Sequence, residues 1–112
     1  MAVPLYQAKA EFFRTLGHPA RIRVLELLCE RDHAVHELLD AIAIEQSNLS
    51  QQLAVLRRAG LVGSSRDGST VLYTLSTPDV ADLLLAARRI LTTMLSDQGE
   101  LLAELRAGAD PA

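Results

Sequence analysis

The sequence contains no tryptophan, a single cysteine and only four other aromatic residues, two Tyr and two Phe. One cysteine excludes an internal disulfide and fits a reducing compartment. With so few aromatic side chains, the core has to be built from aliphatic residues, which suits packed helices. The 112 residues are enough for one domain with a modest core.

Long apolar runs are also missing. No stretch approaches the ~20 apolar residues that a membrane-spanning helix needs. The opening residues, MAVPLYQAKAEFF, lack the basic region and long apolar core of a signal peptide. The sequence therefore predicts a cytoplasmic protein without a membrane partner.

The net charge of −3 is unevenly distributed. Residues 1–43 carry five Lys/Arg and six Asp/Glu, residues 44–75 carry three and two, and residues 76–112 carry three and six. Contacts with phosphate need local Lys and Arg rather than a basic protein as a whole. The acidic balance therefore does not exclude nucleic-acid binding through residues 44–75.

Hydrophobic periodicity predicts four helices in the first half of the chain. Their ranges are 5–16, 19–30, 35–42 and 46–60. In the second helix the apolar stripe includes Cys29, so we expect this helix to be central and Cys29 to be packed within it. Only residues 43–45 separate the third and fourth helices, which must therefore cross steeply. This is the geometry of a helix-turn-helix, here covering residues 35–60.

After Gly60 the pattern changes to that of two strands. Asp67-Gly68 between two such runs is a strong hairpin signal and predicts a wing over residues 61–75. Thr77-Pro78 then begins a last helix that reaches residue 106 if Gly99 does not interrupt it, followed by a frayed tail at 107–112. The expected fold is a single domain over residues 1–112, mainly α with a small β-hairpin, in the order α-α-α-α-β-β-α: a winged helix-turn-helix.

The apolar faces of the first and last helices exceed what one small domain can bury. A helix of ~29 residues would span ~43 Å, more than a domain of this size needs. We expect residues 1–17 and 78–106 to pack against a second copy, because two-fold dimerisation buries both faces at once.

The fourth helix is the candidate binding site. Its leucines at i, i+4 and i+7 face the core and leave amides and hydroxyls outward, which can pair with base edges in a DNA major groove. Arginines near its end and at the hairpin tip can reach the DNA backbone, although an ordinary amphipathic surface helix and a solvated turn arginine are the alternatives. The predicted DNA-binding residues are Gln46, Ser47, Asn48, Ser50, Gln51, Gln52, Arg57, Arg58 and Arg66.

Three segments carry a resemblance to a known family: LGHPARIRVLELL (16–28), VHELLDAIAIEQSNLSQQLAVLRRAGLV (35–62) and RDGSTVLYTL (66–75). In order and spacing they resemble the ArsR/SmtB family of bacterial transcriptional repressors. The resemblance implies a homodimer that binds a pseudo-palindromic operator in double-stranded DNA and represses transcription. It places Ser47, Ser50, Gln51 and Gln52 where family members contact DNA. Glu45 is a departure, because family members often have Ser there.

The family usually senses a signal, and here the sequence departs further. Metal-sensing members often carry a Cys-x-Cys pair on the third helix, where residues 37–40 contain no cysteine. Other members use histidines of the last helix, but no histidine follows His36. Cys29, His33 and His36 are weak metal candidates, since thiolate and imidazole suit zinc. We expect no metal and no cofactor, and the sequence does not identify an effector.

We do not expect an enzyme, because no recognisable motif supplies a nucleophile, a base and an orienting group. Two alternatives to a simple DNA-binding repressor stay open. One is a protein-interaction or dimerisation module on a winged-helix scaffold. The other is a thiol- or metal-responsive repressor that uses Cys29.

Overall fold

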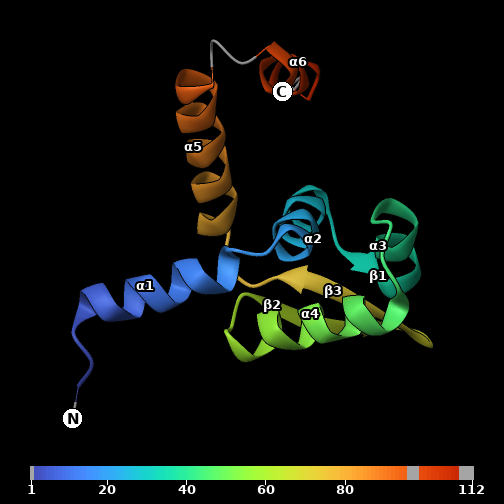
Figure 1. The fold of residues 1–112 in the computed structure, drawn as a ribbon. Coiled ribbons are helices and arrows are strands. Elements are labelled where there is room, and N and C mark those ends of the chain that lie inside the picture. Colours follow the sequence, from blue (N-terminus) through green and yellow to red (C-terminus); the bar gives the residue numbers. More distant parts are fainter. Residues whose placement is uncertain (1, 96–98, 109–112) are drawn as a thin grey trace. The chain divides into compact units, whose positions relative to one another are not determined.

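The computed structural model describes residues 2–95 and 99–108, with the backbone alone described for residues 99–102. The chain divides into two units, residues 1–80 and 81–112. The elements in chain order are α1 (Leu5–Leu16), α2 (Pro19–Glu30), β1 (His33–Ala34), α3 (Val35–Ala41), α4 (Gln46–Arg58), β2 (Val62–Asp67), β3 (Thr70–Leu75), α5 (Asp79–Met94) and α6 (Gly99–Ala107) (Figure 1).

The junction between α1 and α2 lies between the predicted helices 5–16 and 19–30. α1 ends at Leu16, and His18 is the N-cap of α2, with its imidazole Nδ1 accepting a hydrogen bond of 3.1 Å from the backbone N–H of Ala20. Pro19 occupies the first helical position, where its missing N–H costs no hydrogen bond. The chain therefore changes direction here without leaving a helix end unsatisfied.

The core of the first unit is aliphatic and centred on α2, as predicted. α2 contacts both α4 and β3, and α4 contacts β2. Among the described residues no Phe or Tyr side chain is buried. The fully buried large side chains are Val24, Leu25, Leu38, Leu49, Leu53 and Leu56.

The prediction that Cys29 packs in the stripe of α2 is wrong. Its side chain is exposed. Cys29 lies three residues after the exposed Glu26 and therefore on the same side of the helix as this carboxylate. The buried stripe of α2 ends at Leu28.

The helix-turn-helix has the short connection that the sequence predicts. α3 ends at Ala41 and α4 begins at Gln46. Ile42 caps α3 and is buried, and its carbonyl accepts a hydrogen bond of 2.9 Å from the N–H of Ile44. The turn is thus held by its own backbone and by one apolar anchor.

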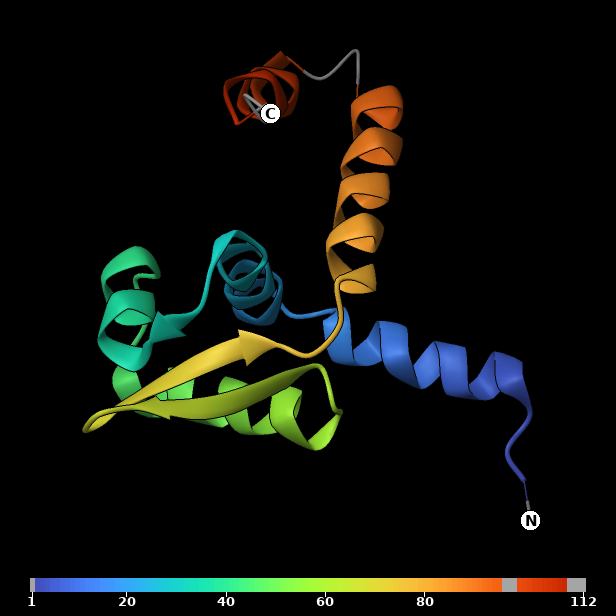
Figure 2. The ribbon, with the colours of Figure 1, turned by 180° about the vertical axis from the view of Figure 1, so that it is seen from behind.

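The predicted hairpin is present, and a third strand joins it. Asp67 pairs with Thr70 across the turn. Gly68, within the turn, has a φ of 66°, a backbone conformation that residues with a Cβ rarely adopt. No strand was predicted between helices 19–30 and 35–42, but His33 and Ala34 pair antiparallel with β3, which gives the strand order β1-β3-β2. Figures 1 and 2 show α4 running along this sheet, so its position is set by the sheet and by α2 together.

The second unit contains two helices, whereas the sequence predicts one over residues 78–106 if Gly99 does not interrupt it. Thr77 accepts a hydrogen bond of 3.3 Å from the N–H of Asp79 through its hydroxyl, as expected of a cap. The guanidinium of Arg88 in α5 donates to the carbonyl of Leu105 in α6, which are 17 residues apart. One straight helix would separate these residues by ~25 Å, so α5 and α6 must be distinct helices.

The predicted frayed tail begins too early, because Ala107 is the last residue of α6. Residues 96–98, between α5 and α6, and residues 109–112 lie outside the described residues. Within the described part of the chain, no helix combines the length and the apolar character needed to cross a membrane.

Candidate nucleic-acid interface

α4 is attached to the core through one face, as its sequence pattern predicts. Leu49, Leu53 and Leu56 are at most 2% exposed. The opposite side begins with polar residues that carry no charge, and four of them are exposed. These are Gln46, Ser47, Ser50 and Gln51.

Gln52 does not share that exposed side, so its predicted outward orientation is wrong. Its side chain is 7% exposed. Position 52 follows Leu49 by three residues and precedes Leu56 by four, which places it on the buried face of the helix. This spacing was present in the sequence and could have identified Gln52 as an inward residue.

A buried amide needs hydrogen-bond partners, and Gln52 has them on both sides. Its Oε1 accepts a bond of 2.7 Å from Nε of Arg21 in α2, and its Nε2 donates a bond of 2.9 Å to Oδ1 of Asn48. Arg21 also donates through Nη1 to the carbonyl of Thr15, at 3.0 Å. The sequence pattern did not single out Arg21, because its partner lies 31 residues away.

Asn48 is half-buried and stands in the first turn of α4. Residues near the start of the second helix of a helix-turn-helix are the ones that reach base edges. The structure therefore places Asn48 between the buried amide of Gln52 and the polar surface of α4.

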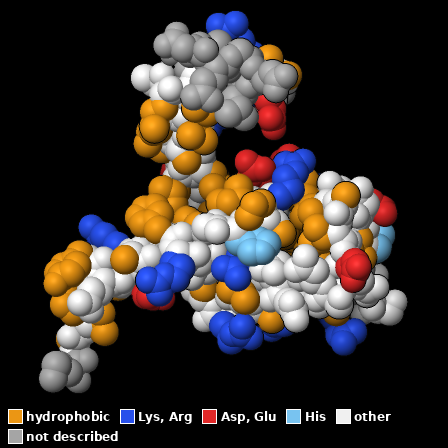
Figure 3. Space-filling model, in the orientation of Figure 1, with side chains coloured by type: hydrophobic (Ala, Val, Ile, Leu, Met, Phe, Trp, Pro, Cys, Tyr) orange, Lys and Arg blue, Asp and Glu red, His pale blue; other side chains and the backbone are white. Residues whose placement is uncertain are grey.

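The predicted basic residues are all exposed. Arg57 and Arg58 lie in the last turn of α4, and Arg66 lies in β2, one residue before Asp67 at the hairpin turn. Figure 3 shows basic side chains along the lower edge of the molecule, where α4 and the hairpin lie. The first turn of α4 contains no acidic residue, although Glu45 stands at its N-cap. Positive charge is thus concentrated beside the polar surface of α4, although the net charge of the protein is negative.

The weak metal candidates are not brought together. Within residues 2–95 and 99–108, no group of three His, Cys, Asp or Glu side chains is placed to hold a metal ion. His33 is buried with Nδ1 2.8 Å from the carbonyl oxygen of Arg31, whereas His36 is exposed on α3. Although the Cys29 side chain is exposed, neighbouring atoms partly desolvate its thiol, and this desolvation, followed by the charges of Glu26 and Glu30, raises the pKa of the thiol. A protonated thiol is a poor nucleophile and a poor metal ligand.

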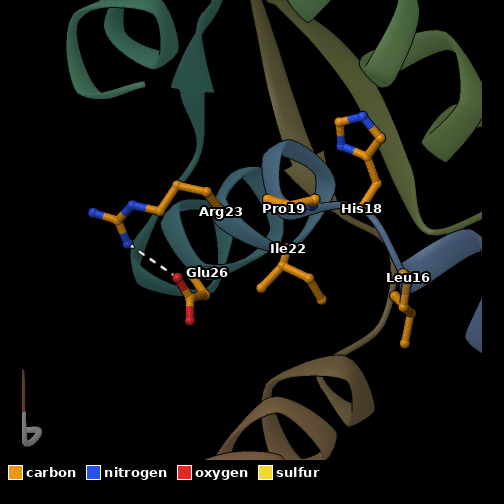
Figure 4. Close-up of a pocket in the computed structure, with 7 residues that line it drawn as sticks. Leu16, His18, Pro19, Ile22, Arg23 and Glu26 are labelled. Carbon is orange, nitrogen blue, oxygen red and sulfur yellow. Dashed lines mark hydrogen bonds and ion pairs between the residues drawn. The ribbon is translucent and has the colours of Figure 1, made fainter. Parts of the chain in front are cut away.

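A shallow apolar hollow of about 600 Å³ lies where α1 meets α2 (Figure 4). An ion pair of 3.2 Å between Arg23 and Glu26 lies at one side of it. Apolar residues dominate the rest of the lining. The residues that line it are Leu16, Gly17, His18, Pro19, Ile22, Arg23 and Glu26.

Comparison with known proteins agrees with this geometry. A family model described as bacterial regulatory protein, arsR family, matches residues 18–64. The chain is 58% identical over 106 residues to an uncharacterised HTH-type transcriptional regulator of Mycobacterium tuberculosis, Rv0081, covering 94% of this chain and 93% of that protein. The crystal structure of Rv0081 matches with a TM-score of 0.78, over 87% of this chain and 98% of that one.

Two further solved structures share the fold. The transcriptional repressor BigR of Xylella fastidiosa is 35% identical, with a TM-score of 0.66 over 85% of this chain and 90% of that one. The homodimeric winged helix-turn-helix DNA-binding domain Mb0332 of Mycobacterium bovis is 25% identical, with a TM-score of 0.73 over 86% of this chain and 89% of that one.

Proposed function

The chain belongs to the ArsR family of bacterial transcriptional regulators, and from this premise we propose that it is a homodimeric repressor that binds a pseudo-palindromic operator. In this proposal α4 enters the major groove and the β2–β3 wing contacts the neighbouring backbone. The observation that carries it is the exposed, uncharged polar side of α4, with arginines at its end and on the wing.

The residues divide into two roles. Ser47, Ser50 and Gln51 are exposed hydrogen-bonding groups that suit base edges. Gln46 precedes them, and Asn48 lies between Ser47 and Ser50. Arg57, Arg58 and Arg66 suit phosphates, which position a protein on DNA without reading its sequence.

The second copy is supported by apolar residues that the chain leaves exposed. On and beside α1 these are Val3, Leu5, Tyr6 and Phe13, and on α5 they are Leu85, Ile90, Leu91 and Met94. Exposed apolar sets of this kind mark interaction surfaces. Mb0332, which has the same fold, is described as homodimeric. A dimer would also present two α4 helices to the two halves of a palindrome.

Anisotropy titrations at two salt concentrations test the proposal. The probe is the promoter fragment upstream of the chain's own gene, and the control is a scrambled fragment of equal composition. Three arginines per protomer give six phosphate contacts per dimer, so we expect log K to fall with log salt with a slope of about −5. We also expect tighter binding to the promoter fragment. Equal binding to both fragments, or binding insensitive to salt, would contradict the proposal.

The proposal places the chain in the cytoplasm, where bacterial DNA is found, and includes no catalytic step, cofactor or metal. We expect zinc, nickel and cadmium to leave operator affinity unchanged, because the two metal sites common in the family lack their ligands in this sequence. Release of DNA on addition of metal, reversed by a chelator, would contradict this expectation.

A further inference from the structure

Arg21, Gln52 and Asn48 form a chain of hydrogen bonds from α2 to the first turn of α4. Arg21 Nε donates to Gln52 Oε1 at 2.7 Å, and Gln52 Nε2 donates to Asn48 Oδ1 at 2.9 Å. Gln52, in the middle, is buried, so little water competes for its amide. The carbonyl of Thr15 holds the other end of the Arg21 guanidinium.

The guanidinium of Arg21 fixes which amide atoms of Gln52 and Asn48 donate and which accept along this series of hydrogen bonds. A guanidinium has donors and no acceptor, so Gln52 must turn its oxygen toward Arg21. Its NH₂ group then faces Asn48, which must in turn offer its own oxygen. Neither amide can rotate by 180° without placing two donors or two acceptors against each other. The NH₂ group of Asn48 is what remains for an external partner.

We propose that Arg21 and Gln52 hold Asn48 as a hydrogen-bond donor toward DNA and so determine which base α4 selects at one position of each half-site. The inference rests on the proposed function, because it assumes that α4 enters the major groove. Guanine offers two acceptors there, N7 and O6, whereas cytosine offers a donor. An asparagine free to rotate would instead suit adenine, with one donor and one acceptor. The constrained Asn48 prefers guanine and rejects cytosine.

Gln52→Glu tests this without altering Asn48. A carboxylate of the same shape accepts from Arg21 but cannot donate to Asn48. Asn48 therefore rotates, donates to Glu, and turns its oxygen toward the DNA. In competition binding against half-sites varied at every position, we expect the preference at one position to change from guanine to cytosine, by about 10- to 100-fold.

Gln51→Glu is the matched control. It adds the same charge one residue away, at an exposed position of the same helix. Both variants lose affinity through repulsion of phosphate. Because Gln51 is itself proposed to read a base, the control should change the preference at its own position of the half-site, but we expect it to keep guanine at the position that Asn48 reads. A second variant, Asn48→Asp, keeps the bond from Gln52 and presents a carboxylate oxygen outward, so it should also favour cytosine. Asn48→Asp replaces Gln52→Glu as the test if Gln52→Glu does not fold.

A measurement without DNA completes the test. By NMR of the free protein, we expect slow proton exchange at the NH₂ of Gln52 and fast exchange at that of Asn48, and slow exchange at Asn48 in Gln52→Glu. If the original protein prefers guanine and Gln52→Glu prefers it too, the inference is overturned and the proposed function stands. If Asn48 exchanges equally fast in both proteins, the inference is also overturned. If no base is preferred at any position, the proposed function fails and takes the inference with it.

Discussion

α1 and α4 are amphipathic helices of nearly equal length, 12 and 13 residues, in the same unit, yet their apolar faces end differently. In α4 the leucines Leu49, Leu53 and Leu56 are all buried by the chain itself. Of the described residues of α1, Leu16 alone is buried. The same periodicity therefore serves the protomer's own core in one helix and leaves a face for another molecule in the other.

The polar sides of α1 and α4 also differ, in how their charged side chains are paired. In α1 the guanidinium of Arg14 pairs with the carboxylate of Glu11 on the surface, so these charges neutralise each other. In α4 the exposed polar side is uncharged until Arg57 and Arg58. α4 thus offers its polar side for binding and α1 its apolar side, which is the division that a dimeric DNA-binding protein needs.

The largest effect should come from the buried face of α4. Leu49 is 0% exposed, and Leu49→Ala should lower the free energy of unfolding by about 3–5 kcal/mol, through lost burial and the cavity left behind. Urea denaturation measures this loss, which should not depend on protein concentration.

The matching change in α1 is Leu5→Ala, at a residue that is 69% exposed. Its loss should be smaller and should grow with protein concentration, because the leucine is buried only by a second copy. Equal losses that are independent of concentration would remove the contrast between the two helices.

The exposed side of α4 can be compared with the wing in the same way. Gln51→Ala should relax the base preference at one position of the half-site by about 1–3 kcal/mol, because a base contact is lost. Arg66→Ala should weaken binding to every sequence and reduce the salt slope by about 1 per protomer. Titrations with operator and scrambled DNA at two salt concentrations separate the two. Uniform losses from both variants would contradict the division between reading and positioning.

The features predicted correctly were those with local signals. The bounds of α1, the short turn before α4 and the hairpin at Asp67-Gly68 each follow from residues within a few positions of one another. β1 carries no such signal, because two residues are too few to show a period. Its pairing with β3 joins residues about 40 positions apart, beyond the reach of local patterns.

The site shows the same limit. The leucine spacing predicted correctly which side of α4 is buried, but Gln52 was assigned by residue type rather than by its angle on the helix. Its burial is stabilised by Arg21, a partner on another helix. Cys29 was assigned to the core because it continues the apolar stripe of α2 and free cysteines usually are buried, whereas the buried stripe ends at Leu28 and Cys29 is exposed. Polar partners in tertiary structure cannot be read from periodicity alone.

A smaller effect is expected at the apolar face of α1. Phe13 is 55% exposed and packs edge-on against Phe12, with ring centroids 5.4 Å apart. If a second copy buried the exposed part of the Phe13 side chain, the dimer would gain about 1 kcal/mol of binding free energy per protomer. Phe13→Ala should therefore weaken the dimer by roughly 30-fold, as measured by sedimentation equilibrium. Thr15→Ala, on the same helix, is the control, and a dimer equally weakened by both would argue against a specific role for Phe13.

The smallest expected effect is on thermal stability, and it arises because the N-termini of α3 and α4 differ in their side-chain hydrogen bonds. In α3 the carboxylate of Glu37 accepts a bond of 2.9 Å from the N–H of Ala34 and pairs with Arg31 at 3.1 Å. The backbone bond, followed by the bond from Arg31, lowers the pKa of Glu37. In α4, Glu45 at the N-cap makes no side-chain capping bond with the described residues. The start of α3 is thus closed by its own chain, while that of α4 stays available to a partner.

This difference predicts a pH dependence. Because the pKa of Glu37 is lower in the folded than in the unfolded protein, its carboxylate stabilises the fold above the ordinary glutamate pKa of about 4.3, and this contribution is lost as the pH falls through the folded pKa. Glu37→Gln should therefore lower Tm at pH 7 and progressively less as the pH is reduced below about 4. Glu45→Gln, the matched change at the start of α4, removes no side-chain capping bond among the described residues, so it should lower Tm less at pH 7. Thermal melts of both variants between pH 7 and pH 3 decide the point, since parallel curves would mean that the two helix starts are equivalent.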